Sequence, residues 1–264
     1  MVNKQDPNTN NKKVESVNID FYNKLYKRKN IFLQLIHPFI SYDQQSKSKP
    51  NYKIIRSLFC NLKNTDEFNF LDYGFGHGSL LLKIPRKNGL FGCDISDEAV
   101  VNFPRVAKLL GKNVVTFTPD QLHSVHAKFN LISSSHVLEH VDDDLTLLNK
   151  FYDLLVAKGS VLINVPINEV WEDPKHIRKY TSSSMRELLT KAGFTVVSLQ
   201  EKNRLSAFLL FNERVKKGNV FSKLFFRTLR LFLALIPLKI LESFDFLLSE
   251  KYKFQHLIVL AQKI

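Results

Sequence analysis

Residues 70–81, FLDYGFGHGSLL, are the most constraining stretch of this 264-residue sequence. Three glycines alternate there with bulky residues, between two short apolar runs. Because glycine has no Cβ atom, Gly74, Gly76 and Gly78 let the backbone turn tightly and let a ligand approach it closely. A strand, a glycine-rich turn and a helix in this order are typical of a binding site at the carboxyl end of a parallel strand.

Apolar runs of strand length alternate with helix-like patterns around this stretch. The patterns predict strands at 69–73, 90–94, 113–117, 129–135, 160–166 and 194–200, and helices at 79–86, 97–110, 142–157 and 182–192. A further run at 254–262 is expected to rejoin the sheet as a seventh strand. Such alternation predicts an α/β fold, a mostly parallel sheet with helices on both faces.

The remaining segments predict additions to this core. Residues 1–18 have the composition of a disordered tail. Residues 19–64 are expected to form an N-terminal helical cap, 65–200 and 254–264 the core, and 201–253 a helical insertion. Within the insertion, residues 219–250 are rich in Phe and Leu and predict two helices broken at Pro237.

The net charge of +13 is unevenly distributed. Residues 1–64 hold 12 Lys/Arg against 4 Asp/Glu, and residues 201–258 hold 11 against 5, whereas the middle is nearly neutral. The basic flanks are either solvated surface or face phosphate, anionic lipid or nucleic acid. Only two cysteines are present, so we expect no disulfide framework and a cytoplasmic protein.

An acidic residue closes the second predicted strand. Asp94 lies 16 residues after Gly78, where a carboxylate can accept hydrogen bonds from both hydroxyls of a ribose. The glycines are spaced G-x-G-x-G, so the loop lacks the last glycine of the dinucleotide motif G-x-G-x-x-G. Asp72 would repel a pyrophosphate but suits an ammonium group. Asp72 and Asp94 together fit a ligand with a cationic amino-acid end and a ribose, as in S-adenosylmethionine.

Four segments carry a family resemblance: LDYGFGHG (71–78), GCDIS (92–96), SSHVLEHV (134–141) and HIRKYTSSSMRELLTKAGFTVV (176–197). In this order they resemble class I S-adenosylmethionine-dependent methyltransferases, in the branch of the ubiquinone and menaquinone methyltransferases. The resemblance covers roughly residues 50–200 and 254–263. It implies a Rossmann-like, seven-stranded sheet in the order 3-2-1-4-5-7-6, with the last strand antiparallel.

The resemblance also implies the cofactor contacts. Asp72 would lie near the methionine amino group, and the backbone of Gly74, Gly76 and Gly78 along the amino-acid part. Asp94 would bind the ribose. The adenine and methionine parts would be contacted by Ile95, by Asp120 or Gln121, and by His136.

A hydroxyl acceptor must lose its proton, and histidine suits that step. We predict His140, His176 and Tyr180 as residues that act on the acceptor. His140 could instead cap the turn before the Asp-rich helix, and the loop of His176 could be an ordinary connection. Lys175, Arg178 and Trp171 are further candidates for binding the acceptor in that loop. The spacing of His136, Glu139 and His140 could also hold a metal ion, but the prediction is no metal.

The sequence therefore predicts a methyltransferase that acts on an oxygen, or a nitrogen, of a small or lipid-linked acceptor. The apolar insertion could be a lid, a packed helix pair or a peripheral membrane contact through 219–249. Two alternatives are an NAD(P)-dependent oxidoreductase and a non-catalytic nucleoside-binding scaffold. Nucleic acid is not expected, because no Asn-Pro-Pro-Tyr-type tetrapeptide follows the fourth predicted strand.

Overall fold

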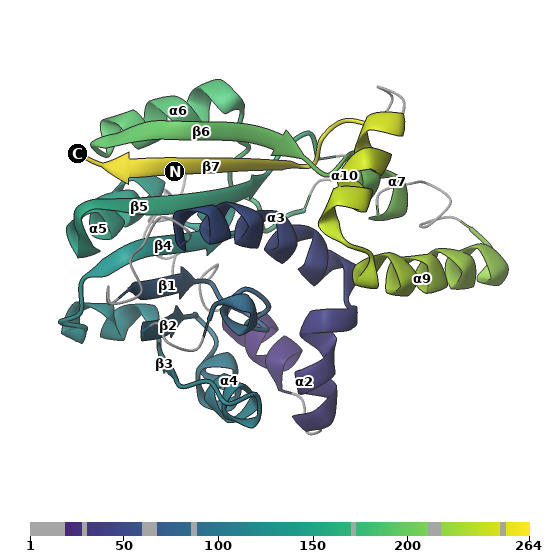
Figure 1. Ribbon diagram of the computed structural model, residues 1–264, viewed down its shortest axis with the longest axis horizontal. Helices are drawn as coiled ribbons and strands as arrows, with labels where there is room; N and C mark the ends of the chain where they lie inside the picture. The colour runs from purple at the N-terminus through teal and green to yellow at the C-terminus, as the bar shows by residue number, and fades with distance from the viewer. Residues whose placement is uncertain are drawn as a thin grey trace, which may run out of the picture.

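The computed structural model describes residues 19–27, 31–59, 68–85, 89–169, 173–210, 218–248 and 252–264. The predicted tail 1–18 and Trp171 lie outside this part of the chain. Within it, one twisted sheet is covered by helices on both faces, and further helices lie beside the ends of its strands (Figure 1).

Seven strands form the sheet in the order β3-β2-β1-β4-β5-β7-β6. β7 is antiparallel to both of its neighbours, and the other pairs are parallel. The predicted fold class and strand order are therefore confirmed. The strand bounds are β1 Asn69–Tyr73, β2 Gly89–Cys93, β3 Val114–Phe117, β4 Phe129–Ser135, β5 Leu155–Pro166, β6 Phe194–Lys202 and β7 His256–Lys263.

Alternate residues of the central strands enter two separate hydrophobic clusters. Leu71 and Ile132 point to the face covered by α5 (Asp144–Leu154) and α6 (Ser182–Lys191). Phe70 and Leu131 point to the opposite face, which packs on α3 (Tyr42–Phe59) and α4 (Asp97–Leu109). Burial on both sides explains why these strands are almost continuously apolar. Cys93 is buried without a disulfide, and Cys60 lies outside the described residues.

Side-chain caps define where the core helices begin. The oxygen of Ser96 accepts from Ala99 N before α4, and Asp143 accepts from Thr146 N before α5. Thr181 forms a capping box with Ser184 before α6. Because Asp143 is a cap, α5 begins at Asp144 rather than at the predicted residue 142. Short 3-10 turns, η2 Pro119–Ser124 and η3 Leu138–His140, connect other elements.

The predicted helix at 79–86 is wrong. Of residues 79–85, which the structure describes, only Leu81–Lys83 are helical, as the 3-10 turn η1. Ile84 takes an extended conformation with ψ 139°, because the ring of Pro85 disfavours a helical conformation in the residue before it. The chain therefore leaves the glycine bend through a short turn, and α3 covers part of this face instead.

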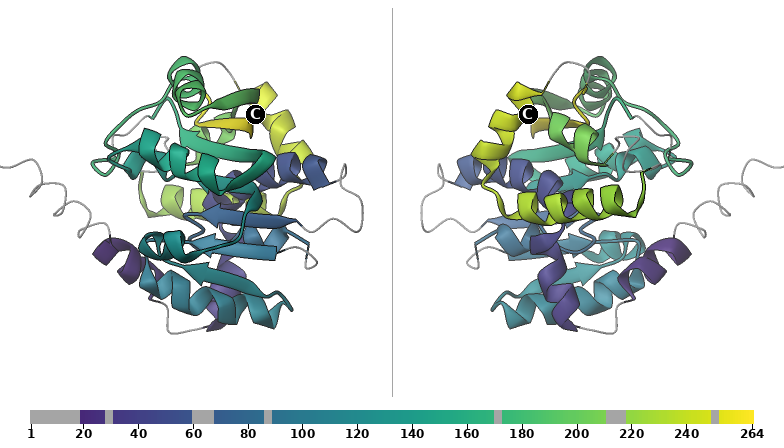
Figure 2. Two further views of the ribbon diagram at one scale, coloured as in Figure 1. Left: turned by 90° about the vertical axis from the view of Figure 1, so that its left-hand side faces the viewer. Right: turned by 90° about the vertical axis from the view of Figure 1, so that its right-hand side faces the viewer.

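Helices from both ends of the chain pack together beside the sheet (Figure 2). Residues 19–26, α2 Ile31–Ile40 and α3 come from the N-terminal part. α7 Arg204–Leu210, α9 Val220–Leu235 and α10 Leu238–Leu247 precede β7. The break at Pro237 was predicted, whereas α7 was not. These C-terminal helices share a third hydrophobic cluster with Tyr42 at the start of α3.

The long side chain of Lys49 joins the two helical groups. Its Nζ donates to the carbonyl oxygens of Ala234 (2.7 Å) and Ile236 (2.6 Å), where α9 ends. Lys53 adds an ion pair to Glu242 of α10 at 2.8 Å. Among the described helices, none combines the length and apolar character that crossing a bilayer requires.

Candidate functional site

A cavity of about 700 Å³ opens beside the carboxyl ends of β1, β2 and β4. Its walls come from these strand ends, the helix at 19–26, α3 and the loop that contains His176. Of the predicted site residues, those that line it are Asp72, Gly74, Gly76, Asp94, Ile95, His136, His140 and His176. Four others, Gly78, Asp120, Gln121 and Tyr180, lie outside the lining.

The glycine bend follows β1 as the sequence predicted. Gly74 N donates to Cys93 O at 2.7 Å and Gly78 N donates to Phe75 O at 2.7 Å, which holds the bend against β2. All three glycines have positive φ, between 53° and 79°. A Cβ at Gly74 would overlap Val137, and one at Gly78 would overlap the ring of Phe103. Gly78 thus serves the packing of the bend, while Gly74 and Gly76 face the cavity.

Asp94 connects this bend to the end of β2. One carboxylate oxygen accepts from Gly76 N at 2.8 Å, and the other accepts from Ser96 N at 3.0 Å. The side chain is buried, and burial raises its pKa to about 6 in spite of these two hydrogen bonds. Each oxygen keeps a lone pair that can accept a further hydrogen bond from a ligand hydroxyl.

Asp72 lies nearby, one residue before the end of β1, in register with Gly92 and Ser133. Burial and the neighbouring Asp94 raise the pKa of its carboxyl to about 7. Two buried carboxyl groups, neither of them ion-paired with a described residue, therefore face the cavity. A ligand with a cationic group and a diol fits this arrangement.

The adenine-side residues are arranged differently from expectation. Ile95 and Pro119 line the cavity, whereas Asp120 and Gln121 lie outside the lining. Gln121 Oε1 accepts from Thr118 N at 3.1 Å, so its side chain closes the capping box of η2. Pro119 was not predicted, because a proline carries no sequence signal for binding. The predicted contacts were its neighbours, Asp120 or Gln121.

His136 follows β4 with a positive φ of 56°. Its half-buried ring packs on the buried ring of His256, with centroids 4.9 Å apart, and its Nδ1 lies 3.3 Å from Glu139 Oε1. Within the described part of the chain, its Nε2 finds no hydrogen-bond partner. Burial holds the pKa of His136 well below the ordinary value, so the ring is neutral at physiological pH.

His140 and His176 meet edge to face in the cavity wall, with ring centroids 4.8 Å apart. Nδ1 of His140 lies 3.0 Å from the carbonyl oxygen of Lys175, and Nδ1 of His176 pairs with the Glu169 carboxylate. Because a carbonyl oxygen only accepts hydrogen bonds, Nδ1 of His140 carries the proton, and its Nε2 has a lone pair that can accept one. The ring of His176 lies between two carboxylates, with Nε2 4.0 Å from Asp173 Oδ2.

Glu139, His140 and His176 could also hold a metal ion. One ligand atom from each lies within 4.8 Å of the others. Glu139 is fully buried, and apart from the contact of Oε1 with His136 Nδ1 its oxygens have no partner among the described residues. The cluster differs from the spacing noted in the sequence, because it includes His176 instead of His136. The prediction of no metal stays untested by this geometry.

The hydroxyl of Tyr180 is engaged in hydrogen bonds within the protein. It donates to Asp144 at 2.8 Å and lies 3.2 Å from the carbonyl oxygen of Leu138. Arg178 donates to the carbonyl oxygens of Val141 and Asp142 at 2.6 Å each. Both residues brace the turn that carries His140, and neither lines the cavity. We therefore assign Tyr180 no step on the acceptor.

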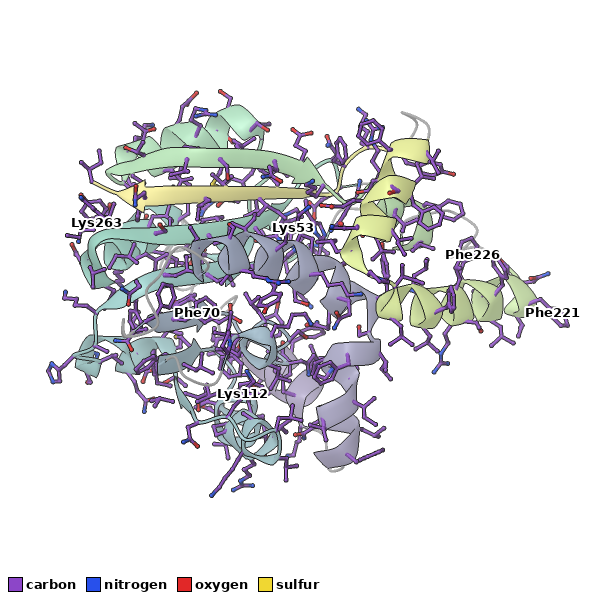
Figure 3. All side chains as sticks on the ribbon, viewed as in Figure 1. Lys53, Phe70, Lys112, Phe221, Phe226 and Lys263 are labelled. Atoms are coloured by element: carbon purple, nitrogen blue, oxygen red, sulfur yellow. The ribbon has the colours of Figure 1, made fainter. Side chains whose placement is uncertain are left out.

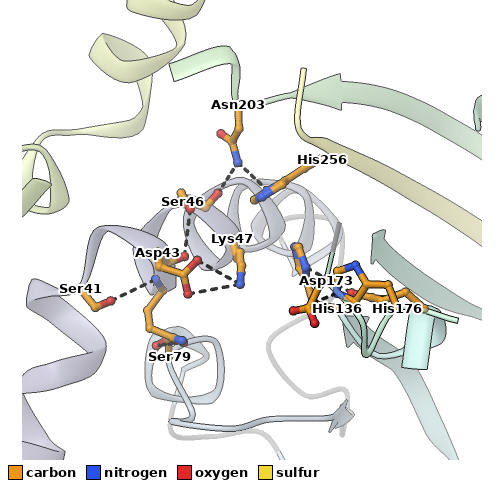
Figure 4. A network of polar contacts seen from close by, with 12 residues as sticks. Ser41, Asp43, Ser46, Lys47, Ser79, His136, Asp173, His176, Asn203 and His256 are labelled. Atoms are coloured by element: carbon orange, nitrogen blue, oxygen red, sulfur yellow. Dashed lines mark hydrogen bonds and ion pairs between the residues drawn. The ribbon is translucent and has the colours of Figure 1, made fainter. Parts of the chain in front are cut away.

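Sequence reasoning missed the contribution of α3. Asp43, Lys47 and Asn51, one helical turn apart, line the cavity together with Gln44 and Ser48. Lys47 bonds to Asp43 at 3.2 Å, and this pair projects from α3 on the side where His136 lies (Figure 4). The signal available was the repeat of polar residues at every fourth position, which is also typical of a solvated helix.

Tyr22 and Tyr26 of the N-terminal helix were missed as well. They line the cavity, and the Tyr22 ring packs edge-on to His140, with centroids 6.5 Å apart. Burial, with Glu139 and Asp94 nearby, raises the pKa of Tyr22 to about 12. Its hydroxyl therefore keeps its proton and can act as a hydrogen-bond donor.

Comparisons with known proteins agree with this geometry. A family model described as a methyltransferase domain matches residues 26–199. A curated relative, the protein-lysine N-methyltransferase efm4 of Schizosaccharomyces pombe, is 25% identical over 164 residues. The match covers 59% of this chain and 64% of the relative, so the chain spans less than two thirds of the length of that protein.

Solved structures show the same fold. Magnesium protoporphyrin IX methyltransferase of Synechocystis, crystallised with bound SAH, aligns with a TM-score of 0.57 at 12% identity, over 95% of this chain and 100% of that one. A phosphoethanolamine N-methyltransferase of Haemonchus contortus, in complex with S-adenosylmethionine, aligns with a TM-score of 0.56 at 16% identity, over 92% and 60%.

The fold and the cavity define a class I methyltransferase, and the chain belongs to the methyltransferase-domain family. Membership of this family favours a methyltransferase over the NAD(P)-dependent oxidoreductase that the sequence left as an alternative. The quinone-methyltransferase branch suggested by the sequence stays a prediction.

Proposed function

We propose that the protein transfers a methyl group to an oxygen, or less favourably a nitrogen, of a small or lipid-linked acceptor. Sugars, glycan precursors, quinone-like lipids and secondary metabolites are acceptors of this kind. The observation that supports this proposal is the pair of histidines whose Nδ1 atoms are both held by acceptors. Such a pair leaves Nε2 as the base at the cavity surface.

Two sets of residues in the cavity would have different roles. Asp72, Asp94 and the bend at Gly74 and Gly76 would hold the cofactor, whose sulfonium supplies an activated methyl group. As the methyl group bonds to the acceptor oxygen, its bond to the sulfonium sulfur would break and S-adenosylhomocysteine would leave. Nε2 of His140 or His176 would take the acceptor proton and pass it to water afterwards. Tyr22 would donate a hydrogen bond to the acceptor.

Burial contributes to the rate in this proposal. The N-terminal helix and α3 cover the cavity, so an acceptor between them would lose much of its hydration. Because the methyl donor is already activated, positioning and desolvation of the acceptor oxygen supply much of the acceleration. His136, neutral and with Nε2 unpartnered, would accept a hydrogen bond from the acceptor or the cofactor.

A protein lysine is the second candidate acceptor. The curated relative is named as a protein-lysine methyltransferase, and three carboxylates, Asp142, Asp143 and Asp173, lie at the cavity wall where an ammonium group could enter. A lysine ammonium also has to lose a proton before its nitrogen can accept the methyl group, so the same histidines would serve.

The proposal is tested with S-adenosylmethionine that carries a labelled methyl group, incubated with lipid, small-molecule and protein fractions of cell extract. Label in lipid or small-molecule fractions supports the proposal. Label confined to protein lysines assigns the second candidate. Tight binding of S-adenosylhomocysteine with no labelled product in any fraction would assign a non-catalytic scaffold.

The proposal includes a cytoplasmic location with peripheral contact to a membrane. Support for the first comes from the cysteine usage, with Cys93 buried and reduced. Support for the second comes from the exposed apolar residues of α9 and α10.

A further inference from the structure

The outer face of α9 is apolar and unusually exposed. Phe221, Phe225 and Phe232 have 81%, 62% and 62% of their surface exposed, and Leu224, Leu231 and Leu235 are exposed beside them. At 100° per residue these six side chains fall within an arc of roughly 120°. Figure 3 shows Phe221 pointing away from the fold, whereas Phe226, only 5% exposed, turns inward.

Neighbouring helices extend this apolar surface. α10 adds Phe244, Phe246 and Leu247, and α2 adds Phe32 and Leu33, all of them exposed. Figure 2 shows α2, α9 and α10 on the same side of the molecule. Soluble monomers rarely expose so many large apolar side chains on one side, and such surfaces mark contacts with partners or membranes.

The charges beside the surface are positive. At 100° per residue, Arg227 lies about 40° beyond the edge of the α9 arc, and Lys223 and Arg230 lie about 80° and 100° beyond it. No acidic residue occurs between residues 218 and 241. Glu242, the first acid that follows, is paired with Lys53 and Lys202 on the inner side. Among the described residues, neither Lys223 nor Arg227 has an ion-pair partner.

We propose that this outer face of α9, with its flanking cations, docks on the surface of an anionic lipid bilayer. The helix would lie in the plane of the interface, with the phenylalanines among the acyl chains and the basic side chains at the lipid phosphates. A second copy of this chain is a poorer occupant, because it would bring two rows of unpaired cations together. With 16 residues, α9 is too short to span a bilayer.

Docking would also orient the cavity. Lys49 and Lys53 tie the outer side of α3 to α9 and α10. The other side of α3 lines the cavity with Asp43, Lys47 and Asn51. The cavity would therefore be held in a fixed orientation to the bilayer. This inference rests on the peripheral membrane contact proposed above and names its lipid, and it does not depend on the identity of the acceptor.

The test is flotation of the full-length protein with vesicles of phosphatidylcholine alone or of phosphatidylcholine mixed with phosphatidylserine. Binding to the mixed vesicles is expected, with weakening by salt. In F221S/F225S the partition coefficient should fall by about tenfold or more per phenylalanine. In K223Q/R227Q it should fall by about fivefold per charge. V101S/L109S, which removes two exposed apolar side chains from α4, should bind as the wild type does.

Equal affinity for S-adenosylhomocysteine in all variants will show that the fold is intact. The proposal is overturned if the protein ignores both vesicle types, or if F221S/F225S binds as tightly as V101S/L109S. Sedimentation of the protein without lipid provides a second arm. A concentration-dependent dimer that F221S/F225S abolishes would assign the face to a second copy and would also overturn the proposal.

Discussion

The two walls of the cavity are built from different materials. The strand-end wall consists of backbone at Gly74 and Gly76 and two buried carboxyl groups, Asp72 and Asp94, all fixed by the register of β1 and β2. The opposite wall consists of side chains from the N-terminal helix, α3 and two loops, including His140 and His176. Since the two walls offer different residues to the cofactor and to the acceptor, cofactor affinity and chemistry on the acceptor should respond separately to mutation.

The largest effect is expected at the wall that contains His140 and His176. H140Q and H176Q each remove a base at Nε2, so we expect labelled-methyl transfer to fall roughly 10²–10⁴-fold. Affinity for S-adenosylhomocysteine, measured by calorimetry, should stay near that of the wild type. H123Q is the matched control, because His123 is exposed outside the cavity. If both cavity variants transfer methyl groups as fast as H123Q, the base lies elsewhere.

The strand-end wall should show the next effect. D94N keeps the shape of the side chain but removes the charge that accepts hydrogen bonds from a diol, and its amide cannot accept from Gly76 N and Ser96 N together. A hydrogen bond to a charged group contributes about 1.5–3 kcal/mol, so affinity for S-adenosylhomocysteine should fall about 100-fold. D120N, at an exposed carboxylate outside the cavity, should bind normally. Equal loss in both variants would contradict the comparison.

The raised pKa values of Asp72 and Asp94 give the third effect. The folded protein holds extra protons between the ordinary carboxyl pKa of 3.8 and the raised values of about 7 and about 6. Its unfolding free energy should therefore fall as pH rises through this window. A cationic ligand favours the ionised carboxyls, so its affinity should rise by up to about tenfold per pH unit for each carboxyl.

Calorimetry in buffers of different ionisation enthalpy measures this linkage, because binding should release protons below about pH 7. D94N should release fewer protons than the wild type. Affinity that is independent of pH across the window would show that these carboxyl groups do not face the ligand.

The smallest effect is expected at Tyr180, which stabilises the turn that carries His140. Y180F removes a buried hydroxyl that contacts Asp144 and Leu138, so the unfolding free energy should fall by about 1 kcal/mol in urea titrations. Y152F, whose hydroxyl has no partner among the described residues, should change it little. If Y180F loses more methyl-transfer activity than its loss of folded protein explains, Tyr180 acts on the acceptor.

The strand-end wall was readable from the sequence because its residues are close together in the chain. Gly74, Gly76 and Asp94 follow two consecutive strands, and parallel strands bring their carboxyl ends to one edge. The strands themselves were readable because burial on both faces makes them apolar. The helix expected at 79–86 failed for a local reason, since Pro85 overrides the apolar pattern before it.

The wall formed by the N-terminal helix, α3 and the two loops could not be predicted in the same way. Lys47 and His136 are separated by 88 residues and meet only because α3 packs across the ends of β4 and β5. The polar positions of α3 look like those of any solvated helix, so their burial depends on tertiary packing. The pairing of Glu139 and His140 with His176 likewise depends on where the loop after β5 returns.

A crystal structure of the protein with S-adenosylhomocysteine tests the division between the walls most directly. The account predicts the ribose diol on the Asp94 carboxylate, the amino-acid end beside Asp72, and the sulfur facing His140 and His176 across the cavity. A diol bound away from Asp94, or a sulfur turned away from both histidines, would contradict it.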